Sequence, residues 1–346
     1  MLNIDLMIDH STWIGKTVPP QLASLSSSLS FNLIELLLHV ADATKNPNYL
    51  GRSLNDFWAF LRYSRCFEAS GNLRLVREFN DIDAHQKTIL SDDIGMGISS
   101  LVMDRTFGVK ALTDTSFFLK YLTSLSTIST GKKGPNKSPD FLVLDSRSDI
   151  HILECKGTQN GISNSDAQIE KGKSQKRSLQ DPNSIISEKL VMGTFIAKST
   201  GINNSRLKII DPDFKYDFSK LTKEEMKYLL LFSQLIKELS FVENENYLTF
   251  FPKEVLPQNI LEGKEYFEKF KSNFLDNQLT RRNFRDAEKY RDIEIEKVYN
   301  FDFVKDNLIQ SRDLKMFLDN FIEEERKIDE GRYKGVFGLE LVISGI

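Results

Sequence analysis

Cysteine and histidine are scarce in this chain. Its 346 residues include two cysteines, Cys66 and Cys155, and four histidines that stand far apart. Two cysteines are too few for a disulfide framework or a cysteine-rich zinc site, and no histidine has a partner at metal-ligand spacing. We therefore interpret the histidines as structural or surface residues and expect a protein of the reducing cytoplasm.

Long apolar runs are also missing, and the N-terminal residues do not lead us to expect a signal peptide. The most apolar stretches, FNLIELLLHVA and YLLLFSQLI, are interrupted by Glu35 and by Ser233-Gln234. Neither reaches the roughly 18 apolar residues that a membrane span needs. The N-terminal MLNIDLMIDH has acids where a signal peptide needs bases. We expect a soluble chain with no membrane partner.

Neither an overall excess of positive charge nor a nucleotide-binding loop is present. The net charge is −3, so any nucleic-acid site must come from a local basic patch. No G-x-x-x-x-G-K-[ST] motif occurs, so ATP-driven activity would have to come from a partner.

The residues that are present favour a large core and a three-part organisation. Hydrophobic residues make up 40% of the chain, with 25 phenylalanines. The pattern predicts a helical region over 1–78, a mixed region over 79–200 and a mainly helical region over 201–346. Helices are expected at 29–43, 53–71, 95–107, 222–240, 265–275 and 314–327. Strands are expected at 139–146, 149–157, 190–199, 247–251 and 336–343. The charged cluster at 281–292 is interpreted as an exposed helix with ion pairs.

One of four E-x-K triplets stands out by its setting. Glu154-Cys155-Lys156 lies in DIHILECKG, a run typical of a strand, where residues two apart point to the same face. Glu225-Met226-Lys227 lies in an expected helix, where residues two apart point roughly 200° apart. Two further triplets begin at Glu262 and Glu325.

A hairpin would place a second carboxylate beside Glu154. PDFLVLDS and DIHILECKG flank a polar Ser146–Asp149 connection, which is a hairpin signature. If the hairpin is symmetric about Arg147, Asp140 lies directly opposite Glu154, about 5 Å away between Cβ atoms. A slip of one residue would put Asp140 on the other face. Two facing carboxylates beside a lysine are not expected to favour folding, because they repel each other, but they suit the binding of a hard divalent cation, which takes oxygen ligands.

These residues resemble a known family. Pro139-Asp140, followed fourteen residues on by Glu154-Cys155-Lys156 in a strand–turn–strand setting, is similar to the motif of the PD-(D/E)XK nuclease superfamily. The resemblance covers roughly residues 90–200 and implies an α/β, restriction-endonuclease-like core with a mixed sheet flanked by helices. It also implies that Asp140, Glu154 and the Cys155 carbonyl bind Mg²⁺ or Mn²⁺. Lys156 would orient the attacking water and offset charge on the scissile phosphate.

Other positions of the family pattern match less closely. Met96 stands where many members carry an acid in the first core helix, so Asp92 or Asp93 would have to serve, although both also suit helix caps. Gln168 is the candidate for a site-facing residue on the helix after the motif, with Lys171 as its rival. Gly172, four residues after Gln168, departs from a subgroup that has Tyr there.

Basic residues flank the motif. Segment 131–177 has nine positive and six negative side chains, a local net of +3. A polyanionic backbone would be bound by such groups, although a solvated loop is the alternative. The candidate nucleic-acid contacts are Lys132, Lys133, Lys137, Lys171, Lys173, Lys176 and Arg177.

The sequence as a whole predicts a Mg²⁺-dependent endonuclease that acts on DNA in preference to RNA. By analogy, a nuclease with helical additions suggests a restriction or phage-defence effector, with a protein partner or a second copy bound through the helical regions. The alternatives are a nuclease-fold subunit that binds nucleic acid without cutting it and a helical scaffold protein.

Overall fold

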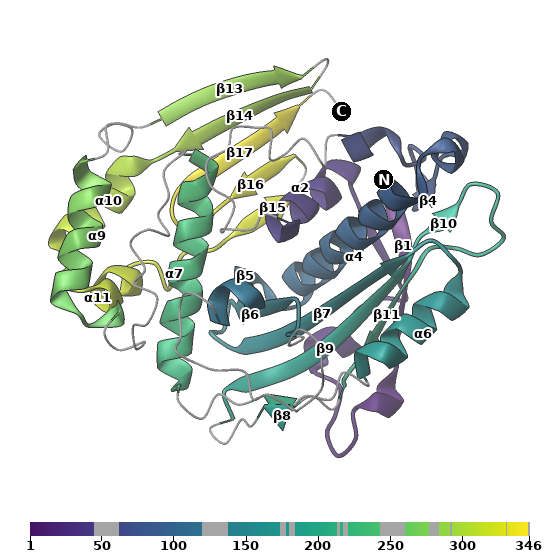
Figure 1. Cartoon of the computed structure of the whole chain (residues 1–346), viewed down its shortest axis with the longest axis horizontal. Coiled ribbons are helices and arrows are strands. Elements are labelled where there is room, and N and C mark those ends of the chain that lie inside the picture. Colours follow the sequence, from purple (N-terminus) through teal and green to yellow (C-terminus); the bar gives the residue numbers. More distant parts are fainter. Residues whose placement is uncertain are drawn as a thin grey trace.

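A mixed β-sheet forms the centre of the protein (Figure 1). The computed structural model describes residues 1–44, 62–119, 138–173, 178–179, 184–212, 215–216, 221–242, 260–276, 284–290, 293–329 and 331–344. The sheet order is β2 (Ser28–Phe31), β1 (Leu2–Ile8), β11 (Arg206–Ile210), β9 (Ile186–Phe195), β7 (Ile150–Thr158), β6 (Phe141–Asp145), β5 (Val109–Asp114), with β3 (Gly71–Asn72) beside β1. β7 and β9 are parallel, whereas β5, β6 and β7 form an antiparallel meander. The expected α/β class, a mixed sheet with helices, is confirmed.

Two helices cover opposite faces of this sheet. α4 (Ala84–Phe107) lies so close to β7 that a Cβ added at Gly157 would stand 1.7 Å from the carbonyl oxygen of Ser91. α6 (Ile162–Lys173) instead packs its Ile169 against Gly193 of β9, which pairs with Lys156. Because neighbouring strand residues point to opposite faces, Lys156 projects toward the α6 face and Gly157 toward α4.

α4 owes its position to its ends and its apolar face. Asp83 caps the N-terminus by accepting a hydrogen bond from the backbone N–H of His85, and Gly108, at φ +68°, ends the helix as expected. One face of the helix, formed by Ile98, Leu101 and Val102, is fully buried, and burial of each such side chain contributes roughly 1.5–3 kcal/mol. The helix begins about a dozen residues earlier than expected.

The described part of the N-terminal region contains strands as well as helices, which the helical interpretation of 1–78 did not predict. α2 (Leu33–Thr44) is present and packs on α4, but β1 and β2 join the central sheet. The residues of β1, LNIDLMI, alternate between core-facing and outward-facing, which is a strand pattern that the helical interpretation passed over. Of the helix expected at 53–71, residues 53–61 lie outside the described residues. The rest is not an α-helix, because it holds the short turn η3 (Arg62–Arg65) and the first residue of β3.

The C-terminal part combines helices with a second sheet. α7 (Lys223–Val242) and α9 (Lys264–Asp276) confirm two expected helices, and α10 (Phe301–Gln310) and α11 (Leu314–Asp319) follow. The second sheet has the order β13 (Phe284–Tyr290), β14 (Ile293–Tyr299), β17 (Leu339–Ser344), β16 (Arg332–Lys334), β15 (Lys327–Asp329). The helix expected at 281–292 is therefore wrong, because β13 and β14 form a hairpin there. The helix expected at 314–327 ends at Asp319, the strand expected at 336–343 is β17, and 247–251 lies outside the described residues.

Short elements connect these parts. They are η1 (His10–Thr12), α1 (Pro20–Ala23), β4 (Arg74–Leu75), η4 (Arg77–Asp81), α5 (Thr115–Phe117), β8 (Ser178–Leu179), β10 (Ala197–Lys198) and β12 (Lys215–Tyr216). Within the described ranges, no helix combines the length and apolarity needed to cross a membrane.

Candidate active site

The β6–β7 hairpin has the register that the sequence suggested. Phe141 pairs with Leu153 and Leu144 with Ile150, so the next position outward sets Asp140 opposite Glu154. Asp145 fixes the turn: its Oδ1 accepts hydrogen bonds from the backbone N–H groups of Arg147 and Asp149, at 2.9 and 2.7 Å. Both oxygens of this buried carboxylate are engaged, since Oδ2 lies 3.1 Å from Nε2 of His151.

Asp140 sits just before β6 and is held on two sides. Its backbone carbonyl accepts a hydrogen bond from Thr115 N–H at 3.0 Å, next to the end of β5. Its Oδ2 accepts one from the backbone N–H of Cys155 at 2.7 Å. The carboxylate is thereby tied to the strand that carries Glu154 and Lys156.

Glu154 and Lys156 lie on the same face of β7 and form an ion pair through Glu154 Oε1. Glu154 is buried, whereas the Lys156 side chain is 26% exposed. Burial alone would lower the pKa of Lys156, but the charges of Asp140 and Glu154 raise it above its ordinary value. Lys156 is therefore a charged ammonium at neutral pH and donates hydrogen bonds.

Asp140 lies in a locally negative environment. Burial raises its pKa to about 7, and the charge of Glu154 adds to the shift, against the opposing effect of Lys156. The ionised form of Asp140 is therefore disfavoured, chiefly by burial and secondly by the charge of Glu154. A cation bound next to Asp140 would lower the pKa of its carboxyl and so favour the ionised form.

The two acids of α4 have different surroundings. Asp92 lies in the turn that packs on Gly157; burial raises its pKa, and the charge of Lys156 opposes that shift. Asp93 accepts a hydrogen bond from the Tyr63 hydroxyl at 2.8 Å. Both lie well inside α4, so the helix-cap interpretation of these residues is wrong.

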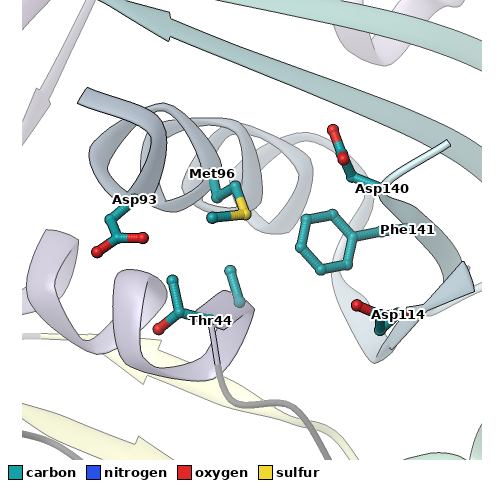
Figure 2. Close-up of a pocket in the computed structure, with 7 residues that line it drawn as sticks. Thr44, Asp93, Met96, Asp114, Asp140 and Phe141 are labelled. Atoms are coloured by element: carbon teal, nitrogen blue, oxygen red, sulfur yellow. The ribbon is translucent and has the colours of Figure 1, made fainter. Parts of the chain in front are cut away.

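A pocket of about 220 Å³ adjoins Asp140 on the α4 side of the hairpin (Figure 2). Its lining includes Thr44, Asp93, Met96, Asp114, Asp140 and Phe141. The sequence interpretation missed the pocket because it did not predict β5, whose last residue is Asp114. The only signal was Met96 itself, noted as standing where related helices carry an acid.

Gln168 lies on the helix that covers the Lys156 face of the sheet. Its Oε1 is buried and has no hydrogen-bond donor among the residues that the structure describes. Lys171 and Lys173 belong to the last turns of the same helix. Lys132, Lys133, Lys137, Lys176 and Arg177 lie outside the described residues.

The donor set fits a hard divalent cation in part. Asp140 and Glu154 supply carboxylate oxygens, which are the ligands that hard divalent cations prefer. Cys155 would contribute only its carbonyl, because its thiol is buried and burial raises the thiol pKa well above its ordinary value. In the described part of the chain, no three His, Cys, Asp or Glu side chains gather as a ready ligand set. Water or substrate oxygens would therefore have to supply most of the remaining coordination.

Comparison of the chain with models of protein families, with curated proteins and with solved structures found no match. The geometry of the hairpin and its surroundings is therefore the basis for assigning a function.

Proposed function

We propose that this protein is a divalent-metal-dependent nuclease of the PD-(D/E)XK kind that hydrolyses phosphodiester bonds, with DNA as the favoured substrate. The observation that carries the proposal is the register of the hairpin, which sets Asp140 opposite Glu154 with Lys156 two residues further along the same face. A mixed sheet with α4 and α6 on its two faces supports the restriction-endonuclease-like core.

In this proposal Asp140, Glu154 and the Cys155 carbonyl hold Mg²⁺ or Mn²⁺. A bound divalent ion would lower the pKa of a water ligand and polarise the scissile phosphate. The hydrogen bond from Cys155 N–H orients Asp140, and the ion pair with Lys156 orients Glu154. The chain thus positions both carboxylates before substrate arrives.

Lys156 has an electrostatic role rather than that of a general base. The carboxylates raise its pKa, so its ammonium has no lone pair with which to remove a proton at neutral pH. It would donate a hydrogen bond to the attacking water and to a phosphate oxygen, where negative charge grows in the transition state. Gln168 Oε1, buried on the same side of the sheet, would accept a hydrogen bond from that water.

The test is a cleavage assay with plasmid, linear duplex DNA, single-stranded DNA and RNA, each with Mg²⁺, Mn²⁺ or EDTA. We expect metal-dependent cutting by the native chain and none by Asp140→Asn or Glu154→Gln. The matched control is Glu262→Gln, which alters an exposed Glu in another E-x-K triplet and should cut normally.

Two results would contradict the proposal. One is full activity of Asp140→Asn or Glu154→Gln. The other is metal-independent binding of DNA without cleavage of any substrate, which would favour a non-cutting nuclease-fold subunit of a larger assembly.

A further inference from the structure

The pocket beside Asp140 combines an apolar centre with polar ends. Figure 2 shows Met96 and the ring of Phe141 in its middle, with Asp93 on one side and Asp114 on the other. These residues come from α4 and from the adjoining ends of β5 and β6, with Thr44 of α2 closing the floor. The pocket is therefore built from four elements that are distant in sequence.

The polar atoms at the two ends are arranged as hydrogen-bond acceptors. Thr44 donates its hydroxyl proton to the carbonyl of Val40 at 2.7 Å, so its oxygen can only accept from a ligand. Asp114 accepts two hydrogen bonds at Oδ1, from Phe117 N–H and the Ser116 hydroxyl, and none of the described residues donates to its Oδ2. Asp93 already acts as an acceptor, since it receives the Tyr63 hydroxyl proton at Oδ2. A ligand that contacts these atoms of the pocket therefore has to supply hydrogen-bond donors.

The charged lining residues and the volume of the pocket restrict the class of ligand that it can bind. Lys156 offers a positive charge on the far side of Asp140, whereas Asp114 lines the pocket, so the phosphate backbone is better placed beside Lys156 and an uncharged part of a nucleotide in the pocket. A fully hydrated ion would face the apolar Met96 and Phe141 without hydrogen bonds. A volume of about 220 Å³ lies below the roughly 300–1,000 Å³ of drug-sized sites and suits one planar base rather than a base pair.

We infer that this pocket receives one unpaired nucleobase of the substrate, of the kind that bears an exocyclic amino group: cytosine, adenine or guanine. This inference rests on the proposed nuclease function. The amino group donates a hydrogen bond to Asp93 or Asp114, and the ring lies against Met96. Enzymes that bind an extruded base combine the same two kinds of contact, hydrogen bonds to the edge of the base and apolar contact with its ring. Thymine and uracil present carbonyl oxygens at the same edge, which the carboxylates repel. The substrate is thus a single strand or a locally opened duplex.

The experiment compares cleavage of single-stranded poly(dC), poly(dA) and poly(dT) oligonucleotides of equal length in Mg²⁺. The native chain should cut the first two about tenfold faster than poly(dT), the size of one good edge contact. Asp93→Asn, whose amide can donate to the thymine carbonyl, should remove or reverse that preference while poly(dT) is still cut. Met96→Trp, which fills the pocket, should reduce all three rates to the same low level. Asp306→Asn, an exposed change on α10, is the matched control and should keep the native preference.

Equal rates on the three oligonucleotides, or an unchanged preference in Asp93→Asn, would overturn the base pocket and leave the nuclease standing. Weaker Mn²⁺ binding by Asp93→Asn in calorimetry, with base preference intact, would assign the pocket to a second cation instead. Failure of the native chain to cut any nucleic acid would overturn the nuclease function and this inference together.

Discussion

The backbone N–H of Cys155 donates a hydrogen bond of 2.7 Å to Oδ2 of Asp140. Asp140 precedes β6, so strand alternation alone does not dictate where its side chain points. The hydrogen bond fixes it to the neighbouring strand and brings it within electrostatic reach of Glu154. Burial, and secondly the charge of Glu154, raise the pKa of this carboxyl to about 7, although the hydrogen bond itself favours the ionised form.

Asp140→Asn should therefore stabilise the metal-free protein at alkaline pH. The folded pKa of about 7 exceeds the ordinary 3.8, so the folded state takes up a proton that the unfolded state lacks between these values. The contribution of Asp140 to stability is fully present below pH 3.8 and is lost as pH rises through 7. The free energy of unfolding of Asp140→Asn should thus exceed that of the native chain by roughly 3–4 kcal/mol more at pH 8 than at pH 4.

Urea unfolding of both chains at several pH values, in EDTA, measures this difference. Titrating groups that do not interact with Asp140, including the buried Glu238 with its pKa of about 7, are common to both proteins and cancel in the comparison. A difference that does not change with pH would show that Asp140 ionises normally, and the local negative charge inferred here would be wrong.

Lys156→Ala should separate catalysis from metal binding. Loss of the ammonium removes a charge that competes with a cation, so Mn²⁺ should bind as tightly as in the native chain or more tightly. Turnover should fall by about 10²-fold or more, the usual effect of removing one preorganised donor to developing charge. Calorimetry and single-turnover cleavage on the same preparation report the two quantities. Lys264→Ala, from an exposed E-x-K triplet, is the control and should alter neither metal binding nor turnover. Cleavage by Lys156→Ala at close to the native rate would instead show that Lys156 is only a salt-bridge partner.

The hairpin was predictable because its information is local. Two β-rich runs, a polar connection and an Asp at the turn suffice to fix the register, and that register sets Asp140 against Glu154. α7 was predictable for the same reason: Thr222 and Glu225 form a capping box, with hydrogen bonds from Thr222 N–H to Glu225 and from Glu225 N–H to Thr222 at 2.8 and 3.1 Å.

Features that depend on distant segments were not predictable. β13 is rich in charged residues and looks like an exposed helix, yet seven pairings with β14 make it a strand, an override of local preference by sheet pairing. The pocket required β5, β6, α2 and α4 to be placed together. The start of α4 was missed because its first three turns are largely polar and carry no helical apolar face.

Gly157→Ala should disturb the candidate active site through the contact between β7 and α4. A methyl group at this position would stand 1.7 Å from the carbonyl oxygen of Ser91, so α4 and β7 must separate next to Lys156. Overpacking of this kind costs roughly 1–3 kcal/mol, and here the clash is with backbone, which cannot rotate away. We expect thermal unfolding several degrees below that of the native chain. Gly201→Ala, whose nearest neighbour would be a carbonyl oxygen at 3.1 Å, is the control; equal melting of both variants would contradict the close packing.

The last prediction concerns the buried charges that join the second sheet to α2. Asp42 receives Arg326 at 2.9 Å and Lys237 at 3.3 Å, and all three side chains are at most 4% exposed. Arg326→Met leaves the Asp42–Lys237 pair intact, so its cost should be modest, about 1–2 kcal/mol. Asp42→Asn instead removes the carboxylate that pairs with both buried cations, and breaking a buried pair in this way costs roughly 3–5 kcal/mol. Lys327→Met, beside Arg326 but in an exposed pair with Asp329, should change stability by less than about 1 kcal/mol.

Urea unfolding should place Asp42→Asn as the least stable variant and Lys327→Met as the most stable, because the penalty follows the uncompensated buried charge rather than the size of the side chain that is replaced. If Arg326→Met were the most destabilised of the three, Arg326 would act mainly by filling space, and the Asp42 cluster would not be the electrostatic link between α2 and the second sheet.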